Sequence, residues 1–380
     1  MFSFLFNCEK TRVNGFKYKK YFFLGKNFIT IKKKVADYSQ ILGVLRYKYV
    51  HILHKTLITV NIVKLLNRYF NQSEHAFIFN SGAAEKVGGR LFGHNIFYGN
   101  IMTLKLDLQI TEKVIVYGLF SPRLSKYLYN NAGVLARTYW AIMGGDLYSA
   151  PDNEIENFVR QNVAGIITTF DKNEYYQRFG NKKTYDIVYN NPIVRYIRKP
   201  VKHKSGKPYR IMINNSTDET TLEMLDFLAK YKDENIIVTT NLSYKTYGQT
   251  DVKNRILKKG REIFGTKFDP VLKWKQPRQY IRFLSSVDVY ISNQNRQQGV
   301  GNISALMLLG KKIFVKSSTT TYSGFTQMGI KVFDTATIKR LPFEEFIQES
   351  KADVERNIQI LNKRFSYTYQ MNLWENVFHG

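Results

Sequence analysis

Residues 287–315 constrain the fold of this chain more than any other stretch. An apolar, strand-like run at 287–291 precedes a polar turn with two glycines at 292–302. An apolar, helix-like run at 303–309 and a second strand-like run at 312–315 follow the turn. Strand, glycine turn, helix and strand in this order predict a parallel β-α-β unit.

The turn of this unit has the composition of an anion-binding site. The free N–H groups and the positive dipole end of a helix start attract phosphate, and glycine lets it approach closely. A guanidinium group binds phosphate in a bidentate manner. We therefore expect a nucleotide diphosphate here; the alternative is a tight turn with solvated polar residues. The candidate residues are Arg296, Gln297, Gln298, Gly299, Gly301 and Asn302.

The length and apolar content of the chain indicate two domains. The chain has 380 residues, of which 44% are hydrophobic, so each half can bury a core of its own. No run approaches the ~18 uninterrupted apolar residues that a membrane-spanning helix needs. The single cysteine, Cys8, excludes an internal disulfide and fits a reducing cytoplasm.

The strong positive charge implies an anionic partner. The net charge is +27, from 57 Lys and Arg against 30 Asp and Glu. Nucleic acid, an acidic membrane face and phosphorylated substrates would all fit; simple solubility is the alternative. The charge is spread along the chain, and no zinc-finger spacing or heptad-linked basic region is found. We therefore expect no nucleic-acid partner, and keep a non-catalytic nucleic-acid-binding protein as the alternative function.

Residues 1–45 differ from the rest and are interpreted as a basic N-terminal extension. They hold nine Lys or Arg against two acidic residues, with aromatic residues interleaved. A peripheral arm that binds an anionic membrane would have this composition. A disordered extension, or a start placed too far upstream, is the simpler interpretation and the one that we favour.

From residue 46 onward, strand-like and helix-like runs alternate twice, with a polar linker at 198–208 between the two series. The first series predicts a doubly wound parallel sheet. The second is followed by a helical tail at 343–378, read as two helices. The expected strands are 49–53, 75–79, 113–117, 138–142, 164–169 and 185–189, then 209–213, 235–239, 287–291 and 312–315. The sequence thus predicts an α/β protein with two facing Rossmann-like domains and a ligand cleft between them.

Ligands of such sheets bind at the carboxyl ends of the strands, so the polar loops there are further site candidates. Asp146 would lie near a substrate, or would cap the next turn. Ser216 or Thr217 would serve as a helix N-cap, completed by Glu219 or Thr220, in a role compatible with phosphate binding. The other candidates in these loops are Gly144, Gly145, Asn215 and Asn241.

Several common catalytic motifs are missing from the sequence. No two aspartates stand two residues apart, so a D-x-D clamp for a metal is absent. Walker-type, G-x-S-x-G and H-E-x-x-H motifs are absent as well. Gly299 and Gly301 supply only half of the dinucleotide signature, which weighs against an epimerase. We expect neither a metal site nor a cofactor.

With these loops in place, the chain resembles the glycosyltransferase 56 family over about residues 47–375. The stretches that carry the resemblance are 140–148, 214–219 and 295–302. The known member of the family transfers 4-acetamido-4,6-dideoxygalactose from a TDP-sugar to an undecaprenyl-diphosphate-linked disaccharide. The sequence departs from the family at Ala141 and Met143, where the family carries a histidine and a tryptophan. The enzyme class is therefore a firmer expectation than the particular sugars.

The resemblance implies a GT-B architecture and a metal-independent transfer. It predicts an acceptor domain at 46–200, a donor domain at 201–345 and C-terminal helices at 346–380 that pack back on the first domain. The donor would be a TDP-sugar or UDP-sugar, and the acceptor an undecaprenyl-diphosphate-linked saccharide. The basic protein would meet the anionic inner face of the cell membrane from the cytoplasm.

The resemblance also assigns roles to the candidate residues. Arg296 and residues 299–302 would hold the donor diphosphate, with 215–217 and Asn241 assisting. Asp146 would act as the catalytic base or would position the acceptor. The remaining acceptor-side candidates are His51, Gly144, Gly145 and Tyr148.

Overall fold

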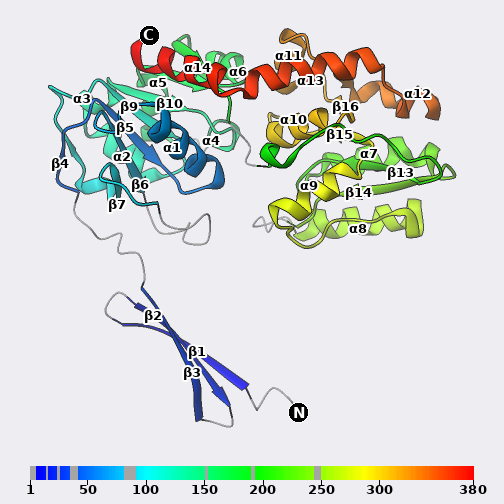
Figure 1. The fold of residues 1–380 in the computed structure, drawn as a ribbon, viewed down its shortest axis with the longest axis horizontal. Coiled ribbons are helices and arrows are strands. Elements are labelled where there is room, and N and C mark those ends of the chain that lie inside the picture. The colour runs from blue at the N-terminus through cyan, green and yellow to red at the C-terminus, as the bar shows by residue number, and fades with distance from the viewer. Residues whose placement is uncertain are drawn as a thin grey trace. The chain divides into compact units, whose positions relative to one another are not determined.

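The computed structural model describes residues 6–13, 16–23, 26–34, 42–80, 91–149, 153–189, 193–243 and 250–380, with side chains described from residue 42 onward. The chain is an α/β protein (Figure 1). It divides into two compact units, Met1–Thr138 and Tyr139–Gly380. None of the helices in the described ranges combines the length and apolar character needed to cross a bilayer.

Three antiparallel strands form near the N-terminus, in the order β1-β2-β3. They are β1 (Phe6–Val13), β2 (Phe16–Phe23) and β3 (Lys26–Lys34). The preference for a disordered extension is therefore wrong for these three segments. Aromatic and basic residues alternate in the first half of β2, Phe16-Lys17-Tyr18-Lys19, with the period of two that a strand requires.

Seven strands form the first large sheet, in the order β12-β11-β10-β9-β5-β6-β7. The pairings of β5 with β6 and β9, of β6 with β7, and of β11 with β10 and β12 are parallel. The strands are β5 (Tyr49–Leu53), β6 (His75–Asn80), β7 (Ile96–Gly99), β9 (Lys113–Tyr117), β10 (Thr138–Ala141), β11 (Gly165–Thr168) and β12 (Lys183–Asp186). A separate short parallel pair joins β4 (Val44–Leu45) and β8 (Lys105–Leu106).

Side chains cap the starts of α1, α2 and α5 among the helices between these strands, whereas Asn131 before α3 and Asp171 before α6 make no side-chain cap hydrogen bond. Thr56 and Thr59 form a reciprocal capping box at the start of α1, and Ser121 caps α2 with Pro122 at its first position. The helices are α1 (Leu57–Tyr69), α2 (Pro122–Tyr129), α3 (Ala132–Leu135), α4 (Gly145–Tyr148), α5 (Glu154–Asn162) and α6 (Lys172–Phe179).

A second, five-stranded parallel sheet lies entirely within Tyr139–Gly380, in the order β14-β13-β15-β16-β17. Its strands are β13 (Tyr209–Ile213), β14 (Ile236–Thr240), β15 (Val289–Ser292), β16 (Lys312–Val315) and β17 (Phe333–Asp334). Its helices are α7 (Thr220–Leu228), α8 (Thr250–Phe264), α9 (Pro277–Ser285), α10 (Val300–Leu308), α11 (Thr320–Gln327), α12 (Phe343–Ile347), α13 (Lys351–Phe365) and α14 (Tyr367–His379).

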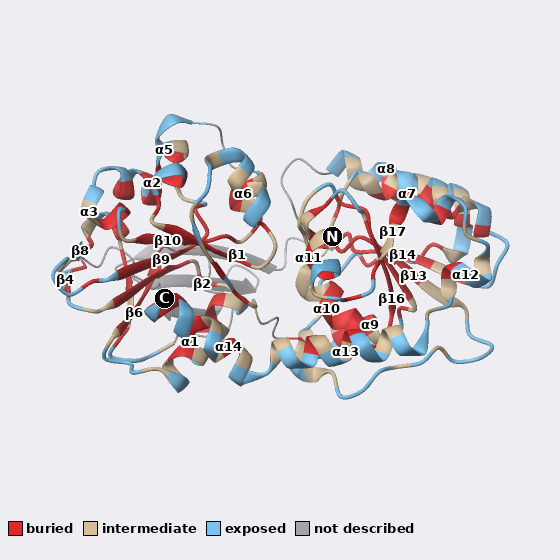
Figure 2. Ribbon diagram, turned by 90° about the horizontal axis from the view of Figure 1, so that it is seen from above, coloured by how far each residue is buried: buried red, intermediate tan, exposed pale blue. Residues whose placement is uncertain are grey.

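Both faces of the five-stranded sheet are buried, as a doubly wound sheet requires. Ile211 and Ile213 of β13 pack with α7, α8 and α12, whereas Met212 between them packs with α9, α10, α11 and α13. Figure 2 shows these buried strands between helices whose outer sides are exposed. The alternation follows from the period of two along a strand, and it confirms the predicted doubly wound α/β architecture.

The C-terminal tail contains three helices rather than the two expected from the sequence. α13 lies against α10, and α14 lies against β12 of the first large sheet. Arg364, at the end of α13, pairs with Asp186 of β12 at 3.0 Å. The last three helices therefore contact elements of both sheets within Tyr139–Gly380.

Candidate functional site

The loop between β15 and α10 provides an uncapped helix start. Gly299 is the N-cap residue of α10 and has a left-handed φ of 71°, which favours glycine. No side chain caps α10, and its first turn holds no acidic residue. A nine-residue helix that begins in this way leaves backbone N–H groups and a positive dipole end for an anion.

Ser216 connects the β13 loop to this helix start. Its hydroxyl oxygen accepts hydrogen bonds from Gln298 Nε2 at 2.8 Å and from Gln294 Nε2 at 3.0 Å. The expectation that Ser216 or Thr217 caps the following helix is wrong, because α7 begins at Thr220 without a side-chain cap. Ser216 instead holds two glutamines of the β15 loop.

Asn214 ties the same two loops together through a strained backbone. Its φ of 43° is the only positive value among the described non-glycine residues. Its Oδ1 accepts the Asn293 N–H at 2.9 Å, and its Nδ2 donates to Thr221 Oγ1 at 3.0 Å. Asn tolerates left-handed backbone better than most residues, so the sequence can fix this junction without glycine.

Close packing of Gly299 on Asn215 brings two predicted donor-side residues together. A Cβ atom at Gly299 would lie 2.8 Å from Asn215 Nδ2, closer than real Cβ contacts allow. Asn215 and Thr217 are both buried. The β13 and β15 loops therefore form one continuous surface, as the rule for strand ends predicted.

The cations of this region are Arg296 and Lys316. Arg296 is half-buried in the β15–α10 loop, and within the described ranges it makes no hydrogen bond or ion pair. Lys316 follows β16 and donates to Asn295 Oδ1 at 2.5 Å. An arginine in this position is available to bind an anion at the start of α10.

Three other predicted donor-side residues are Asn241, Gly301 and Asn302, and in the part of the chain that the structure describes no side-chain hydrogen bond joins them to the β13 loop. Asn241 is buried and uses its Oδ1 to accept from the Ser243 N–H and hydroxyl in a local turn. Gly301 and Asn302 form the first turn of α10, where the Asn302 N–H donates to the Gly299 carbonyl. Asn241 thus shapes its own loop, whereas Gly301 and Asn302 lie at the helix start itself.

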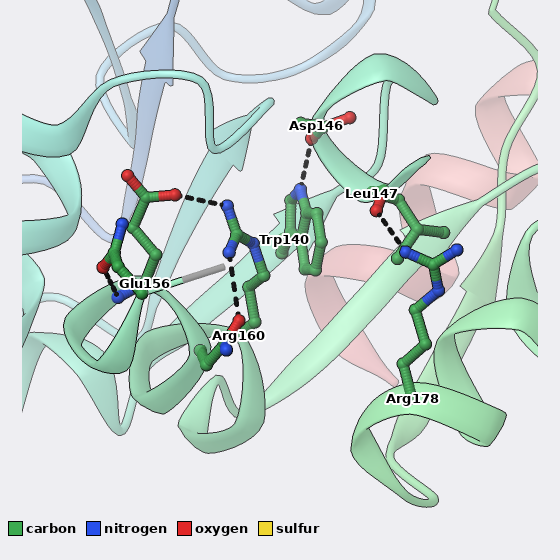
Figure 3. Close-up of polar contacts among 8 residues, drawn as sticks. Trp140, Asp146, Leu147, Glu156, Arg160 and Arg178 are labelled. Atoms are coloured by element: carbon green, nitrogen blue, oxygen red, sulfur yellow. Dashed lines mark hydrogen bonds and ion pairs between the residues drawn. The ribbon is translucent and has the colours of Figure 1, made fainter. Parts of the chain in front are cut away.

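Asp146 is buried and bound by the loop that carries it. Its Oδ2 accepts the Trp140 Nε1–H at 2.6 Å, and its Oδ1 accepts the Met143 N–H at 2.9 Å. Its exposed fraction is 1%. Figure 3 shows the Trp140 contact, which runs from the end of β10 to the short helix α4. The geometry favours the structural alternative for Asp146 over the catalytic base, because both carboxylate oxygens serve to fold the loop.

The short helix α4 is held from its other side by α6. Arg178 donates to the Leu147 carbonyl at 2.9 Å (Figure 3) and lies 5.6 Å from the centre of the Tyr148 ring. Glu156 and Arg160, also drawn there, form a buried ion pair within α5, with Arg160 Nη2 2.7 Å from Glu156 Oε2. Arg178 therefore has a positioning role in this loop.

Gly144, predicted for the acceptor side, and Gln297, predicted for the donor side, lie close together within Tyr139–Gly380. Gly144 has a φ of 89°, and a Cβ atom there would lie 2.8 Å from Gln297 Oε1. Gly144 precedes Gly145, the first residue of α4, while Gln297 belongs to the β15–α10 loop. A side chain at position 144 would thus displace Gln297.

A second contact between the same regions involves a carboxyl group that the sequence analysis missed. The Tyr148 hydroxyl donates to Asp171 Oδ1 at 2.8 Å, and the Thr320 hydroxyl lies 3.3 Å from the same oxygen. Asp171 follows β11, and Thr320 begins α11 after β16. Burial raises the pKa of Asp171 to about 6 despite the hydrogen bond from Tyr148, and burial together with Asp171 raises the pKa of Tyr148.

His51 does not lie in a strand-end loop, and its assignment to the acceptor side is not supported by its position. It is fully buried in the middle of β5, where its Nδ1 is 3.1 Å from Tyr117 Oη and its Nε2 is 3.0 Å from His75 Nδ1. Its ring also stacks on Phe77 at 4.6 Å. Burial, and then the neighbouring His75, lower the pKa of His51 well below its usual value, so the ring is neutral.

Sequence reasoning missed Asp171 and Thr320, whose partners are far away in the chain. Asp171 follows β11 and Thr320 follows β16, so the rule that selected the other loops also applies to them. Asn214 and Gln294 lie in two loops that the sequence selected, but their bonds between those loops were not expected. In the described parts of the chain, no three His, Cys, Asp or Glu side chains gather as a metal site would require.

Two parallel α/β sheets, with polar loops at their strand ends, make up the GT-B fold that the sequence predicted. Solved structures share this fold with the chain at low sequence identity. The N-terminal domain of a Candida albicans trehalose-6-phosphate phosphatase has a TM-score of 0.61 and 8% identity, and covers 88% of this chain and 97% of its own. A UDP-forming trehalose-phosphate synthase from Burkholderia xenovorans has a TM-score of 0.60 and 9% identity, with 87% and 98% covered.

Residues 101–377 match the family described as 4-alpha-L-fucosyltransferase, glycosyl transferase group 56, and the chain belongs to this family. The predicted family and the predicted enzyme class are thereby confirmed. The chain is a glycosyltransferase, and its donor is a nucleotide-sugar.

Proposed function

We propose that this enzyme transfers a deoxyamino sugar from a TDP-sugar, or a UDP-sugar, to a polyprenyl-diphosphate-linked saccharide in bacterial surface polysaccharide synthesis. The observation that carries the proposal is the uncapped start of α10 at Gly299, with Arg296 before it. This arrangement suits the diphosphate of a sugar donor. The positive dipole end and the guanidinium group would stabilise the departing nucleotide diphosphate without a metal.

Neighbouring side chains suit the remainder of a nucleotide. Gln294 is buried, and its Oε1 has no hydrogen-bond partner within the described ranges, although its Nε2 donates to Ser216. A buried acceptor in this state is costly, and a ligand hydroxyl or imide N–H would satisfy it. The ribose or the pyrimidine base of the donor supplies such a donor group.

The acceptor half of the proposal rests on family membership and on charge. The net charge of +27 suits both a diphosphate-linked acceptor and the anionic inner face of the cell membrane. The loop at 142–148 is positioned by Asp146, which we assign a positioning role rather than that of a base. Its Gly144 meets Gln297 of the donor loop, so acceptor and donor loops are in contact.

Calorimetry of the full chain against TDP-, UDP- and GDP-sugars tests the donor assignment. We expect binding of a TDP- or UDP-sugar, and the Arg296→Ala variant should bind it about 10- to 100-fold more weakly, since hydrogen bonds to charged groups contribute roughly 1.5–3 kcal/mol. Arg340→Ala, which removes an exposed arginine elsewhere in the same unit, is the matched control. Unchanged donor affinity in Arg296→Ala would sink the role of Arg296. Binding of none of these sugars, together with tight, salt-dependent binding of DNA, would favour the alternative of a nucleic-acid-binding protein.

A further inference from the structure

An exposed apolar loop precedes α9. Leu272 and Trp274 have exposed fractions of 46% and 57%. The other two of the three tryptophans in the chain, Trp140 and Trp374, are 0% and 2% exposed. Trp274 is therefore the one tryptophan whose ring is available to a partner.

The loop leaves the second sheet at the edge where the donor loops lie. Val271 forms a parallel bridge with Asn241, and its N–H donates to the Thr240 carbonyl at 2.9 Å. The chain at 268–271 thus runs beside β14 in the same direction. Residues 272–276 follow at the carboxyl end of β14, next to Asn241.

All charged residues of the segment that carries these exposed apolar side chains are basic. Residues 270–287 contain four Lys or Arg and no acidic residue. Within α9, Ile281 and Leu284 are buried, whereas Arg278 and Arg282 are exposed. The loop and the outer face of the helix therefore present apolar tips flanked by positive charge.

A second basic segment contacts this face. Residues 193–208 contain six Lys or Arg and again no acidic residue. The guanidinium groups of Arg278 and Arg195 lie 5.9 Å and 4.9 Å from the centre of the Tyr196 ring. Arg195 also donates to Tyr196 Oη at 2.8 Å. The basic face of α9 thus continues onto residues 195–196.

We infer that the surface formed by 272–282 and 195–196, named here the Trp274 surface, docks on an anionic lipid bilayer. Trp and Leu enter the interfacial region of a bilayer, and Lys and Arg contact anionic headgroups around them. The acid-free composition gives the charge complementarity that this partner requires. The inference rests on the proposed function, since it presents the donor loops to a membrane that carries the acceptor.

Fluorescence of the full chain tests the surface directly, because the other two tryptophans are buried. On addition of phosphatidylcholine vesicles that contain phosphatidylglycerol, we expect a blue shift and protection of Trp274 from acrylamide. Pure phosphatidylcholine vesicles should give a much smaller change. Tyr367→Ala, which removes a comparably exposed aromatic ring from α14 (56% exposed), should bind vesicles like the parent chain.

Charge reversal distinguishes vesicle binding through this surface from binding through the overall positive charge of the protein. In vesicle co-sedimentation, Lys273→Glu/Lys275→Glu should weaken binding by at least about 25-fold, or about fivefold for each basic residue removed. The matched control Lys258→Glu/Lys351→Glu reverses two exposed lysines of other helices, and it should leave most of the binding intact.

Calorimetry with a TDP-sugar on the same variants keeps the two proposals apart. Retained donor binding with lost vesicle binding supports the inference. If the donor binds but the parent chain does not bind vesicles, the inference is overturned while the proposed function stands. The same holds if the donor binds and the Lys273/Lys275 variant binds vesicles as well as the parent chain does. Tight binding of single-stranded nucleic acid that the same two substitutions abolish, without binding to vesicles, also overturns it. Failure of every nucleotide-sugar to bind overturns the proposed function instead.

Discussion

Two buried polar clusters in this protein differ in how their members meet. His51, His75 and Tyr117 contact one another in the middle of adjacent strands, within Met1–Thr138. Tyr148 at the end of α4, Asp171 before α6 and Thr320 at the start of α11 contact one another beyond strand ends, within Tyr139–Gly380. The first cluster satisfies its polar atoms inside a sheet, whereas the second joins loops from two different sheets.

The difference teaches that the position of a polar residue relative to a strand end is more informative than its residue type. Histidine is the commonest general acid or base, yet His51 is stacked on Phe77 and has no exposed surface. Threonine is an unremarkable residue, yet Thr320 bonds a carboxyl group 149 positions earlier in the chain. The strand-end loops are where residues distant in sequence are brought to a common surface.

The two clusters also respond to pH in opposite directions. The pKa of His51 lies well below its usual 6.5, so the folded state excludes a proton that the unfolded chain binds, and stability is lost as the pH falls below 6.5. The pKa of Asp171 is raised from 3.8 to about 6, so the folded state keeps a proton longer, and stability is lost as the pH rises from about 4 through 6.

The largest effect on stability is expected from His51→Phe. Phenylalanine can keep the contact with Phe77 but removes one partner each from Tyr117 and His75, at a cost of about 1–3 kcal/mol each. We expect the free energy of unfolding at pH 8 to fall by about 2–6 kcal/mol in total. The loss should shrink at pH 5.5 because phenylalanine takes up no proton. Urea unfolding at both pH values measures this.

Donor affinity should stay unchanged in His51→Phe, since its contacts lie inside the sheet. A normal free energy of unfolding combined with lost transfer would restore His51 to the acceptor side and break the comparison. His54→Phe, in the half-buried loop after β5, provides the matched substitution at a strand end.

The next largest effect on stability is expected from Asp171→Asn, which should raise the free energy of unfolding at neutral pH rather than lower it. Asparagine can still accept the Tyr148 hydrogen bond but carries no charge to desolvate. A shift of about two pKa units corresponds to roughly 3 kcal/mol, so the variant should gain on the order of 2–3 kcal/mol relative to the parent chain between pH 4 and 7. Unfolding curves at pH 4, 5.5 and 7 follow this gain.

An exposed aspartate supplies the control for that series. Asp233→Asn removes an exposed carboxylate, so it measures the general effect of losing one acidic side chain. If Asp171→Asn gives a curve parallel to that of the parent chain, Asp171 is not the buried acid that its surroundings indicate.

Asp146→Asn should have a smaller effect, of about 2 kcal/mol. Asparagine keeps one acceptor oxygen, so either Trp140 Nε1–H or the Met143 N–H faces an amide donor instead. Trp140→Phe removes the same contact from its other end, so a double-mutant cycle should show strong coupling in thermal unfolding. Lost turnover with unchanged unfolding, and no coupling to Trp140, would make Asp146 the base after all.

The sequence predicted most of the fold because long apolar runs dominate its strands. The expected ranges 49–53, 113–117, 209–213 and 312–315 coincide with β5, β9, β13 and β16. Short edge strands escaped prediction or were displaced. β7 and β17 were not expected, and β12 (Lys183–Asp186) overlaps the expected 185–189 but ends at Asp186 although an apolar run continues beyond it. Pairing with a neighbour defines these strands, and that pairing is not a local property of the sequence.

The candidate site divides in the same way. The glycine turn and the polar loops identified Gly299, Asn215 and Ser216, because helix starts and strand ends have local signals. The contacts of Asp171 with Thr320, and of Gly144 with Gln297, depend on packing between segments about 150 residues apart. No local pattern contains that information.

Apart from the control variants, Gly299→Ala should have the smallest effect on stability, and its main effect should be weaker donor binding. A left-handed φ of 71° costs alanine about 1–2 kcal/mol, and its Cβ would press on Asn215 Nδ2. Gly206→Ala is the matched control, because Gly206 has a φ of 77° and no atom within 4 Å of the added Cβ.

Both variants should lose the free energy of the backbone strain, and Gly299→Ala should lose more because its Cβ also clashes with Asn215. Only Gly299→Ala should weaken binding of the nucleotide-sugar in calorimetry. Adding Asn215→Ala to Gly299→Ala relieves the clash and leaves the backbone strain. Recovery of stability without recovery of donor affinity would show that Asn215 serves the ligand as well as the turn. Equal donor affinity in the Gly299 and Gly206 variants would instead place the donor away from the start of α10, because the close approach of backbone and diphosphate is what this glycine permits.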